Sequence, residues 1–383
     1  MRSIPFGKPI LGKPEHEAVA AVLDSGMLVH GEQIKRFEAD LASFTGAPYA
    51  VGVASCTAAL HLAYFHYRIG AGAEVIVPAM THTATAHAVE LSGAKPIFVD
   101  ATLPSGNIDV DAVRAAVTPA TKAISVVHYL GAPADMKALV EIARQHDLKL
   151  IEDCARAIGA YIDDVHVGLW GDLGCFSFYP VKHMTTAEGG AAITRHESLS
   201  AGFHLERAFG VDRHVGERAI PGVYDVVALG FNYRMSEIEA ALGVQQLKRL
   251  PGFLETRAKH HARMWAGLKD IDEVQVLEGT TPNARSSHYC HSVLLDDRLA
   301  GKRPEIIAAM KAQGVGTSVY YPHPVPGMRY YRDKYALSED QFPNAKRIAN
   351  QTIALPVGPH LDEEDVDYVV AALKQAIIQE KSS

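Results

Sequence analysis

One lysine stands apart from the other cations of this sequence. Lys182 lies in "SFYPVKHMTTAEGG" (residues 177–190), between an aromatic run and a glycine pair, and its only neighbour within five positions that can carry a charge is His183. A lysine kept in a partly apolar site has a lowered pKa and becomes a nucleophile that can form a Schiff base. Lys182 is therefore a candidate catalytic residue.

Ser55 and Thr57 offer a second kind of chemistry. They lie in "ASCTAAL" (residues 54–60), where a strand end is expected to turn into a helix. The first turn of a helix has unpaired backbone N–H groups, and together with the two hydroxyls these suit a phosphate. Taken alone, a plain helix N-cap by Ser55 or Thr57 explains the same pattern at least as well.

An acidic pair ends another expected strand, in "IEDCARA" (residues 151–157). Glu152 and Asp153 are adjacent and point to opposite faces, so they do not form a catalytic carboxylate pair. An acid at the end of a buried strand is costly without a cationic partner. A helix N-cap or a structural ion pair would also explain Asp153.

These features together fit pyridoxal phosphate. Lys182 would bind the aldehyde, Asp153 would keep the pyridine nitrogen protonated, and the hydroxyl-bearing segment would hold the phosphate. Ser177, the polar residue of the aromatic strand "FSF", precedes the lysine loop. Each feature is weak alone, and their shared location at strand ends gives the prediction its weight.

The elements that must position these residues follow a regular alternation. Short apolar runs that read as buried strands alternate with helical patterns such as 134–147, whose apolar face is expected to hold Met136, Leu139, Val140 and Ala143. The strands are expected at 50–54, 74–79, 95–101, 123–131 and 149–154. This alternation predicts crossover units and a mostly parallel sheet, with ligands beyond the carboxyl ends of the strands.

The second half of the chain changes character. A helix is expected from Met235 to about Asp270, and Pro251 is expected to break it and to mark the crossing to a second domain. We therefore divide the chain into a large cofactor-binding domain (1–250, with an N-terminal arm) and a smaller α+β domain (251–383). The latter is expected to contain a strand at 288–295 and helices at 303–314 and 362–378.

Bulk properties exclude several classes of protein. The chain has 383 residues and a net charge of −7, which argues against a nucleic-acid-binding surface. Its four cysteines form no CxxC pair, so a reducing compartment is expected. Neither a signal peptide nor a membrane-spanning window is evident, which makes a cytoplasmic enzyme the expectation.

The sequence resembles the sugar aminotransferases of the DegT/DnrJ/EryC1/StrS family, which have the fold-type-I architecture of aspartate aminotransferase. The resemblance runs nearly end to end. It is carried by "SGMLVHGEQIKRFE", "VGVASCTAALHLA", "VIVPAMTHTATAHAV", "IEDCARAIGA", "GDLGCFSFYPVKHMTTAEGGAAIT" and "GFNYRMSEIEAALGVQQL".

The resemblance assigns roles to individual residues. It implies that Lys182 forms the internal aldimine with the cofactor and that Asp153 is the partner of the pyridine nitrogen. The residues expected around the phosphate are Ser55, Cys56, Thr57 and Ser177. Asn232, in "GFNYRMSE", would reach the phosphate from the neighbouring subunit, so the resemblance implies a homodimer with shared active sites.

Two positions depart from the commoner family pattern. His82 stands where members often carry Phe, Trp or Tyr to stack on the cofactor. Arg156 stands where they usually carry Gln or His beside the phenolic oxygen, and its fixed charge would stabilise the deprotonated oxygen. Candidate substrate contacts are His183 and Glu188 beside the lysine, and Tyr320 and His323 in "YYPHP".

The implied function is amino transfer from L-glutamate to a nucleotide-linked keto-deoxy sugar, through a pyridoxamine phosphate form of the cofactor. The motifs lean toward 4-keto sugars carried by UDP. One alternative is a sugar dehydratase of the same family, in which histidine replaces the catalytic lysine; here "YPVKH" retains the lysine. A non-catalytic regulatory protein that binds the cofactor is a second alternative.

Two further motifs invite other interpretations. "HYCH" (288–291) suggests a metal site, but in a strand His288 and Cys290 would face one side and His291 the other, so no metal is expected. "GAGAEV" (70–75) resembles part of a dinucleotide fingerprint, but it precedes its strand and lacks the third glycine. It is predicted to be a turn, which also argues against a nicotinamide oxidoreductase.

Overall fold

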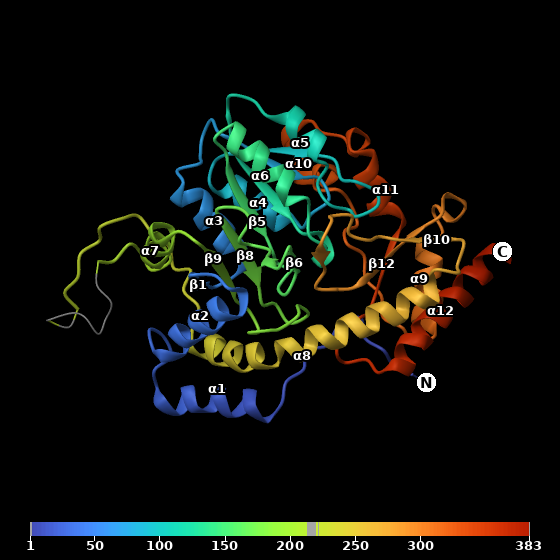
Figure 1. Cartoon of the computed structure of the whole chain (residues 1–383), viewed down its shortest axis with the longest axis horizontal. Coiled ribbons are helices and arrows are strands. Elements are labelled where there is room, and N and C mark those ends of the chain that lie inside the picture. The colour runs from blue at the N-terminus through green and yellow to red at the C-terminus, as the bar shows by residue number, and fades with distance from the viewer. Residues whose placement is uncertain (1, 213–219, 221, 383) are drawn as a thin grey trace.

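The computed structural model describes residues 2–212, 220 and 222–382, and a seven-stranded sheet lies at the centre of the molecule (Figure 1). Its strand order is β1-β9-β8-β5-β4-β2-β3. The strands are β1 (Tyr49–Val53), β2 (Glu74–Pro78), β3 (Lys95–Val99), β4 (Thr121–Val127), β5 (Lys149–Asp153), β8 (Leu173–Ser177) and β9 (Gly190–Thr194). β9 runs antiparallel to β1 and β8, and the other neighbouring strands of this sheet run parallel to one another. The predicted mostly parallel α/β sheet is confirmed.

Helices cover both faces of this sheet. One face packs against α3 (Cys56–His66), α4 (Thr83–Leu91) and α7 (Glu197–Glu206). The other packs against α5 (Val110–Ala116) and α6 (Met136–Gln145), where Ile76 and Ile124 of the central strands meet Leu139. Because both faces are buried, the strands read as continuous apolar runs.

The apolar face of α6 differs in one residue from the expectation. Ile142 is fully buried in this face, whereas Val140 is only partly buried. Met136, Leu139 and Ala143 are buried as expected. Val140 and Ile142 lie on opposite edges of the apolar face of this helix, and the helix packs on the sheet with the edge that carries Ile142.

The long helix α8 (Glu237–Leu268) continues through Pro251, so the prediction that this proline breaks the helix is wrong (Figure 1). Pro251 lies on the exposed side of α8, where water can bind the carbonyl oxygen that loses its N–H partner. The residues on either side, Leu250 and Phe253, are buried and hold the helix in place. The proposed domain boundary near residue 250 therefore falls inside a continuous helix.

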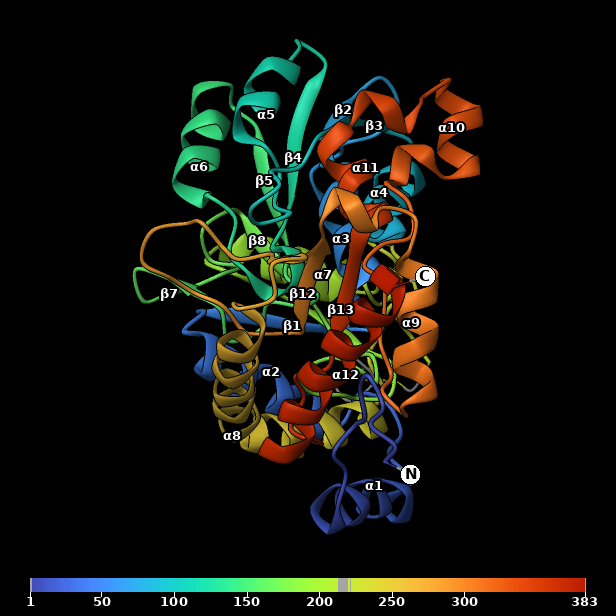
Figure 2. The same cartoon turned by 90° about the vertical axis from the view of Figure 1, so that its right-hand side faces the viewer.

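Each half of α8 belongs to a different core. Its first half packs with α2 (Glu32–Thr45) through Val244 and Leu247, and α1 (Lys13–Ser25) lies alongside. Its last turns contribute Met264 and Leu268 to a second core with α9 (Arg303–Ala312) and α12 (Glu363–Ser382). Figure 2 shows α9 and α12 side by side.

The C-terminal part is built around an antiparallel sheet of order β10-β12-β13. Its strands are β10 (Val274–Val276), β12 (His291–Leu295) and β13 (Thr352–Leu355). A separate small sheet joins β6 (Tyr161–Ile162), β7 (Val165–His166) and β11 (Ala284–Arg285), and the helices α10 (Arg329–Tyr335) and α11 (Pro343–Gln351) complete this part. None of the described helices combines the length and apolar composition needed to cross a membrane.

The strand predicted to begin at residue 288 begins instead at His291. His288 has a left-handed backbone with φ of 51°, which a strand cannot accommodate. The expected alternation of "HYCH" across two faces of a strand is therefore wrong. His288 and His291 both lie near His261 of α8, with ring centroids 4.3 Å from it in each case.

This histidine cluster (His261, His288 and His291) is held in the neutral form. Burial is the main cause that lowers the pKa of His291 to about 3 and that of His288 to about 4, and the positive charge of Arg257 contributes to the shift of His288. Burial likewise lowers the pKa of His261 to about 2. In the described part of the chain, neither ring nitrogen of His291 has a hydrogen-bond partner.

We predict that acid destabilises the protein through this cluster. The unfolded chain binds a proton at each histidine near pH 6.5 and the folded chain does not, so stability is complete above pH 6.5 and falls as the pH decreases below it. For His291, which is 1 % exposed, the loss at pH 5 is about 2 kcal/mol. Urea unfolding at pH 7.5 and pH 5, at one protein concentration, measures it.

The matched variants for this experiment are His291→Phe, which keeps a ring that cannot titrate, and His16→Gln at an exposed position. His291→Phe is expected to lose less stability than the parent protein between pH 7.5 and pH 5, and His16→Gln to lose as much as the parent. Equal losses in all three proteins would contradict the assignment.

Candidate functional site

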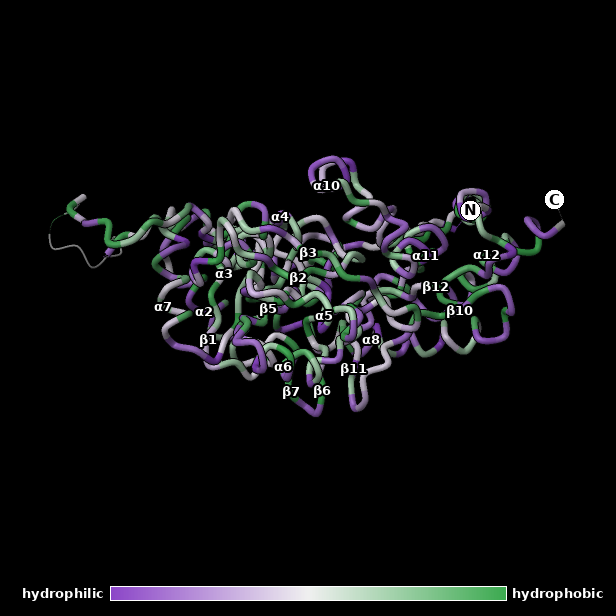
Figure 3. The backbone as a smooth tube through the Cα atoms, turned by 90° about the horizontal axis from the view of Figure 1, so that it is seen from above, coloured by the Kyte–Doolittle hydropathy of each residue, from purple (hydrophilic) through white to green (hydrophobic). Residues whose placement is uncertain are grey.

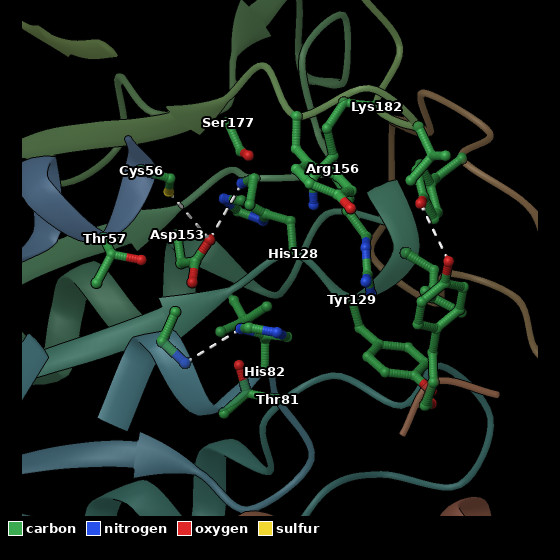
Figure 4. Close-up of a pocket in the computed structure, with 18 of the residues that line it drawn as sticks. Cys56, Thr57, Thr81, His82, His128, Tyr129, Asp153, Arg156, Ser177 and Lys182 are labelled. Carbon is green, nitrogen blue, oxygen red and sulfur yellow. Dashed lines mark hydrogen bonds between the residues drawn. The ribbon is translucent and has the colours of Figure 1, made fainter. Parts of the chain in front are cut away.

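A cavity of about 550 Å³ lies at the carboxyl ends of β4, β5 and β8 and reaches across to the C-terminal part (Figure 4). Many of the residues singled out from the sequence line it together. They are Ser55, Cys56, Thr57, His82, Asp153, Arg156, Ser177, Lys182, Glu188 and Tyr320. The cavity has the size of a site for a cofactor and a small substrate.

One end of the cavity is the N-terminus of α3. Ser55 is the N-cap, and its Oγ accepts a hydrogen bond from the N–H of Ala58 at 3.1 Å. The capping interpretation is therefore correct, and the hydroxyl hydrogen of Ser55 can still be donated into the cavity. Gly190 of β9 lies against this turn, and a Cβ there would meet the backbone of Ser55 at 2.3 Å. Only glycine allows this approach.

The two acids at the end of β5 lie in different environments. Asp153 faces the cavity, and its Oδ1 accepts from the N–H of Ala155 at 3.1 Å. Glu152 is fully buried on the other side and accepts from backbone N–H groups of Gly168, Trp170 and Gly171 at 2.6–2.9 Å. The prediction that the two carboxylates point to opposite faces is confirmed.

Glu152 also contacts His128, whose Nε2 lies 2.9 Å from Oε2. With Cys154 these residues form a buried group whose ligand atoms lie close enough together to hold a metal ion. Their polar atoms are already engaged, because Nδ1 of His128 accepts from Ala134 and both oxygens of Glu152 accept from the backbone. The group thereby fixes the segment 168–171 against the end of the sheet.

Lys182 follows β8 on the loop over the cavity, where it is partly buried. Burial, together with the positive charge of Arg156, lowers the pKa of its amine to about 7. A substantial fraction of the amine is therefore neutral at neutral pH. An uncharged amine is both a nucleophile and a proton acceptor.

Arg156 is surrounded by aromatic rings. Its guanidinium carbon lies 3.9 Å from the ring centroid of Tyr320, 4.9 Å from that of Tyr289 and 5.0 Å from that of Tyr321. Rings at these distances stabilise a cation through their negative faces. In the described part of the chain Arg156 forms no salt bridge, so its charge acts on the cavity.

His82 is the N-cap of α4 at another side of the cavity. Its Nδ1 accepts from the N–H of Ala84 at 3.1 Å, which fixes the ring. Burial and the charge of Arg156 lower the pKa of His82. A flat, uncharged ring is thereby held at the cavity wall.

Three predicted site residues lie outside this cavity. His183 is buried and turned away, with its Nε2 3.0 Å from the carbonyl oxygen of Ser287. His323 is exposed, and its Nδ1 lies 3.7 Å from a carboxylate oxygen of Glu339. Asn232 is exposed beside the chain that follows α7.

The structure adds residues that the sequence analysis did not select. Thr81, His128, Tyr129, Tyr289 and Tyr321 line the cavity, and Thr85 bonds to Asp153 from α4. Thr85 follows His82 by three positions, a spacing that places both on one side of a helix and could have indicated it. The tyrosines at 289 and 321 follow no such pattern.

The profile of the DegT/DnrJ/EryC1/StrS aminotransferase family matches residues 9–374. The chain belongs to this family. It is a pyridoxal-phosphate-dependent sugar aminotransferase of fold type I.

Similar proteins span nearly the whole chain. The spore coat polysaccharide biosynthesis protein SpsC of Bacillus subtilis is 34 % identical, over 98 % of this chain and 97 % of its own. The putative sugar aminotransferase Spr1654 of Streptococcus pneumoniae, solved in PMP and PLP forms, has a TM-score of 0.92 and 28 % identity, over 98 % of this chain and, in the PMP form, 99 % of its own. PseC of Helicobacter pylori, an aminotransferase involved in the biosynthesis of pseudoaminic acid, has a TM-score of 0.92 and 26 % identity, over 98 % and 99 % of the two chains.

We predict that the Lys182 amine of the cofactor-free enzyme titrates near pH 7, because burial and Arg156 both disfavour its charge. The measurement is the pH dependence of amine labelling at Lys182, read by peptide mass spectrometry. In Arg156→Gln the midpoint is expected to rise toward the ordinary value of 10.5.

Lys182→Ala is the control for this labelling, since it removes the reactive amine and leaves the remaining lysines unchanged. A midpoint near 10.5 in the parent protein would contradict the assignment of a neutral amine.

Proposed function

We propose that this family member transfers the amino group of L-glutamate to a nucleotide-linked keto-deoxy sugar, with a UDP-linked 4-keto sugar as the favoured class. The observation that carries the proposal is the meeting of a partly neutral lysine, an aspartate and a helix N-terminus around one cavity. The overall exchange converts L-glutamate into 2-oxoglutarate and the sugar ketone into an amine.

The cavity residues fit pyridoxal phosphate. The N-terminus of α3, where Gly190 leaves the backbone open, suits the phosphate, with Ser55, Cys56, Thr57 and Ser177 around it. Asp153 would accept from the pyridine nitrogen, His82 would lie against the ring, and Lys182 would take the aldehyde. When bound, the cofactor supplies an aldehyde for amine exchange and a ring that withdraws electrons from the α-carbon of the donor.

Lys182 is suited to move the proton in both halves of the exchange. Its amine, with a pKa of about 7, would accept a proton from the donor's α-carbon and return it to the carbon of the cofactor's aldehyde, on the other side of the transferred nitrogen. Asp153 would hold a proton on the ring nitrogen of the bound cofactor, and Arg156 would stabilise negative charge on its phenolic oxygen. The rings of Tyr289, Tyr320 and Tyr321 surround the guanidinium of Arg156.

The rest of the cavity suits a sugar. Tyr179, Tyr289 and Tyr321 present aromatic surface, against which the apolar faces of a sugar ring can pack, and Tyr320 and Glu188 offer polar groups beside Lys182. PseC acts in pseudoaminic acid biosynthesis and SpsC in that of spore coat polysaccharide, which supports a sugar as acceptor. His183 and His323 do not line the cavity, so in this chain they are weaker candidates for substrate contacts.

The position of His183 favours amino transfer over dehydration. A dehydratase of this family uses a histidine in place of the catalytic lysine. Here the lysine lines the cavity, while the adjacent His183 is buried against Ser287 and cannot replace it. The dehydratase alternative therefore lacks its basic group.

We propose further that the enzyme is a homodimer with shared sites. Asn232 is exposed and does not line the cavity of its own chain. In a dimer, Asn232 of each chain would reach the phosphate in the cavity of the other chain. The described chain after α7 runs away from the body of the molecule, and parts of it are coloured as hydrophobic (Figure 3). Several of its apolar side chains are exposed. They are Phe209, Val223, Tyr224, Val226, Val227 and Leu229, which a second copy would cover.

The four cysteines are buried and free, which supports the expected reducing cytoplasm.

The proposed function predicts a two-part result. The cofactor-loaded enzyme is expected to form 2-oxoglutarate from L-glutamate with loss of the PLP absorbance, and then to aminate one of a panel of UDP-, GDP- and dTDP-linked 4-keto sugars, detected by mass spectrometry. D-Glutamate is the control donor. Lys182→Ala is expected to stay folded and to lose nearly all turnover, because it lacks the proton-transferring amine.

A product that has lost water, without formation of 2-oxoglutarate, would reject amino transfer in favour of dehydration. Turnover by Lys182→Ala close to that of the parent enzyme would reject the role of the lysine.

The shared-site proposal predicts complementation between two inactive chains. Lys182→Ala and Asn232→Trp each spoil different halves of a shared site, so a heterodimer of the two has one site with both defects and one with neither. Tandem tags allow its purification, and activity is expected to recover toward half of the parent dimer's. A verified heterodimer as inactive as both homodimers would show that each site belongs to one chain.

A further inference from the structure

Two buried threonines connect α4 to the carboxylate of Asp153. Oγ1 of Thr85 donates to Oδ2 of Asp153 at 2.7 Å, and Oγ1 of Thr81 lies 2.8 Å from Oγ1 of Thr85. Both side chains are completely buried. Figure 4 shows Thr81 and Asp153 on neighbouring elements of the cavity wall.

The direction of this chain of hydrogen bonds is fixed by chemistry. A carboxylate only accepts, and a threonine hydroxyl has a single hydrogen. Thr85 donates its hydrogen to Asp153, so in its contact with Thr81 it must be the acceptor. The sequence of donors therefore runs from Thr81 to Thr85 to Asp153.

Both oxygens of Asp153 are thereby held. Oδ2 accepts from Thr85, while Oδ1 accepts from the N–H of Ala155 at 3.1 Å and has the thiol of Cys56 at 3.9 Å. The torsion that rotates a carboxylate about its last bond is otherwise broad. The hydroxyl from α4 and the amide after β5 together define the plane of this carboxylate.

We propose that Thr85, supported by Thr81, is a positioning residue that aims the Asp153 carboxylate at the cofactor's ring nitrogen and stabilises its charge. This proposal rests on the proposed role of Asp153. It links the segment that carries His82, at the start of α4, to the acid at the end of β5. The two groups expected to contact the cofactor's ring are then oriented by one helix.

The test uses Thr85→Val, which keeps the shape and removes the hydroxyl, and Thr85→Ser, which restores the hydroxyl. Thr352→Val is the matched control, because its buried hydroxyl donates to the carbonyl of Ile348 in the C-terminal part. If Thr85→Val fails to fold, Thr85→Ala serves as the hydroxyl-free variant. PLP affinity of the cofactor-free protein, the pH dependence of the bound cofactor's absorbance, kcat and KM are measured for each.

Thr85→Val is expected to lower kcat by about tenfold or more, the factor for one lost hydrogen bond to a charged group. Its PLP affinity is expected to fall and the pH midpoint of the cofactor's absorbance to move, with KM for the sugar nearly unchanged. Thr85→Ser is expected to recover most of each property. Thr352→Val is expected to match the parent protein in all of them.

A double-mutant cycle separates positioning from packing. If Thr85 acts through Asp153, Thr85→Val has little further effect on kcat or on the absorbance midpoint in an Asp153→Asn background. Equal effects in both backgrounds, or a Thr85→Val enzyme within twofold of the parent, would overturn the proposal. PLP affinity and absorbance report on Thr85 even if the enzyme fails to aminate sugars. Failure of the proposed function can therefore be told apart from failure of the proposed role of Thr85.

Discussion

The carboxyl end of β5 imposes the strongest constraint on this structure, because two adjacent acids end a strand that is buried on both faces. Unpaired charges there would be costly, so each carboxylate needs its own donors. Glu152 takes three backbone N–H groups from the segment 168–171 and contacts His128. Asp153 takes a hydroxyl from α4 and an amide from the following turn. The hydrogen bonds of Glu152 hold the segment 168–171 in place, and those of Asp153 hold α4 and the turn after β5 at the cavity wall.

The second organising feature is a cation that lines the same cavity as the amine of Lys182. Arg156 and Lys182 line one cavity, and the arginine's charge is stabilised by aromatic rings that come mainly from the C-terminal part. The same charge contributes to the neutral state of the lysine. The rings of Tyr289, Tyr320 and Tyr321 therefore line the site and stabilise the charge of Arg156. That charge in turn helps to lower the pKa of Lys182.

The helix α8 explains how distant parts of the chain reach this site. It packs with α2 at one end and enters the second core at the other, so the two parts are held by one continuous element. Tyr289, Tyr320 and Tyr321 are thereby carried over the ends of strands formed by residues 49–194.

The sequence by itself determined the parallel sheet, the strand ends and the residues that meet there, because buried parallel strands are continuous apolar runs whose carboxyl ends share one edge. Ser55, Asp153, Ser177 and Lys182 could be placed together on that basis. Local pattern could not decide the turning of His183 away from the cavity, the left-handed backbone of His288 or the passage of α8 through Pro251. Nor could it supply Tyr289 and Tyr321, two of the tyrosines around Arg156. Those features depend on which surfaces pack together over long sequence separations, and only the tertiary structure determines that packing.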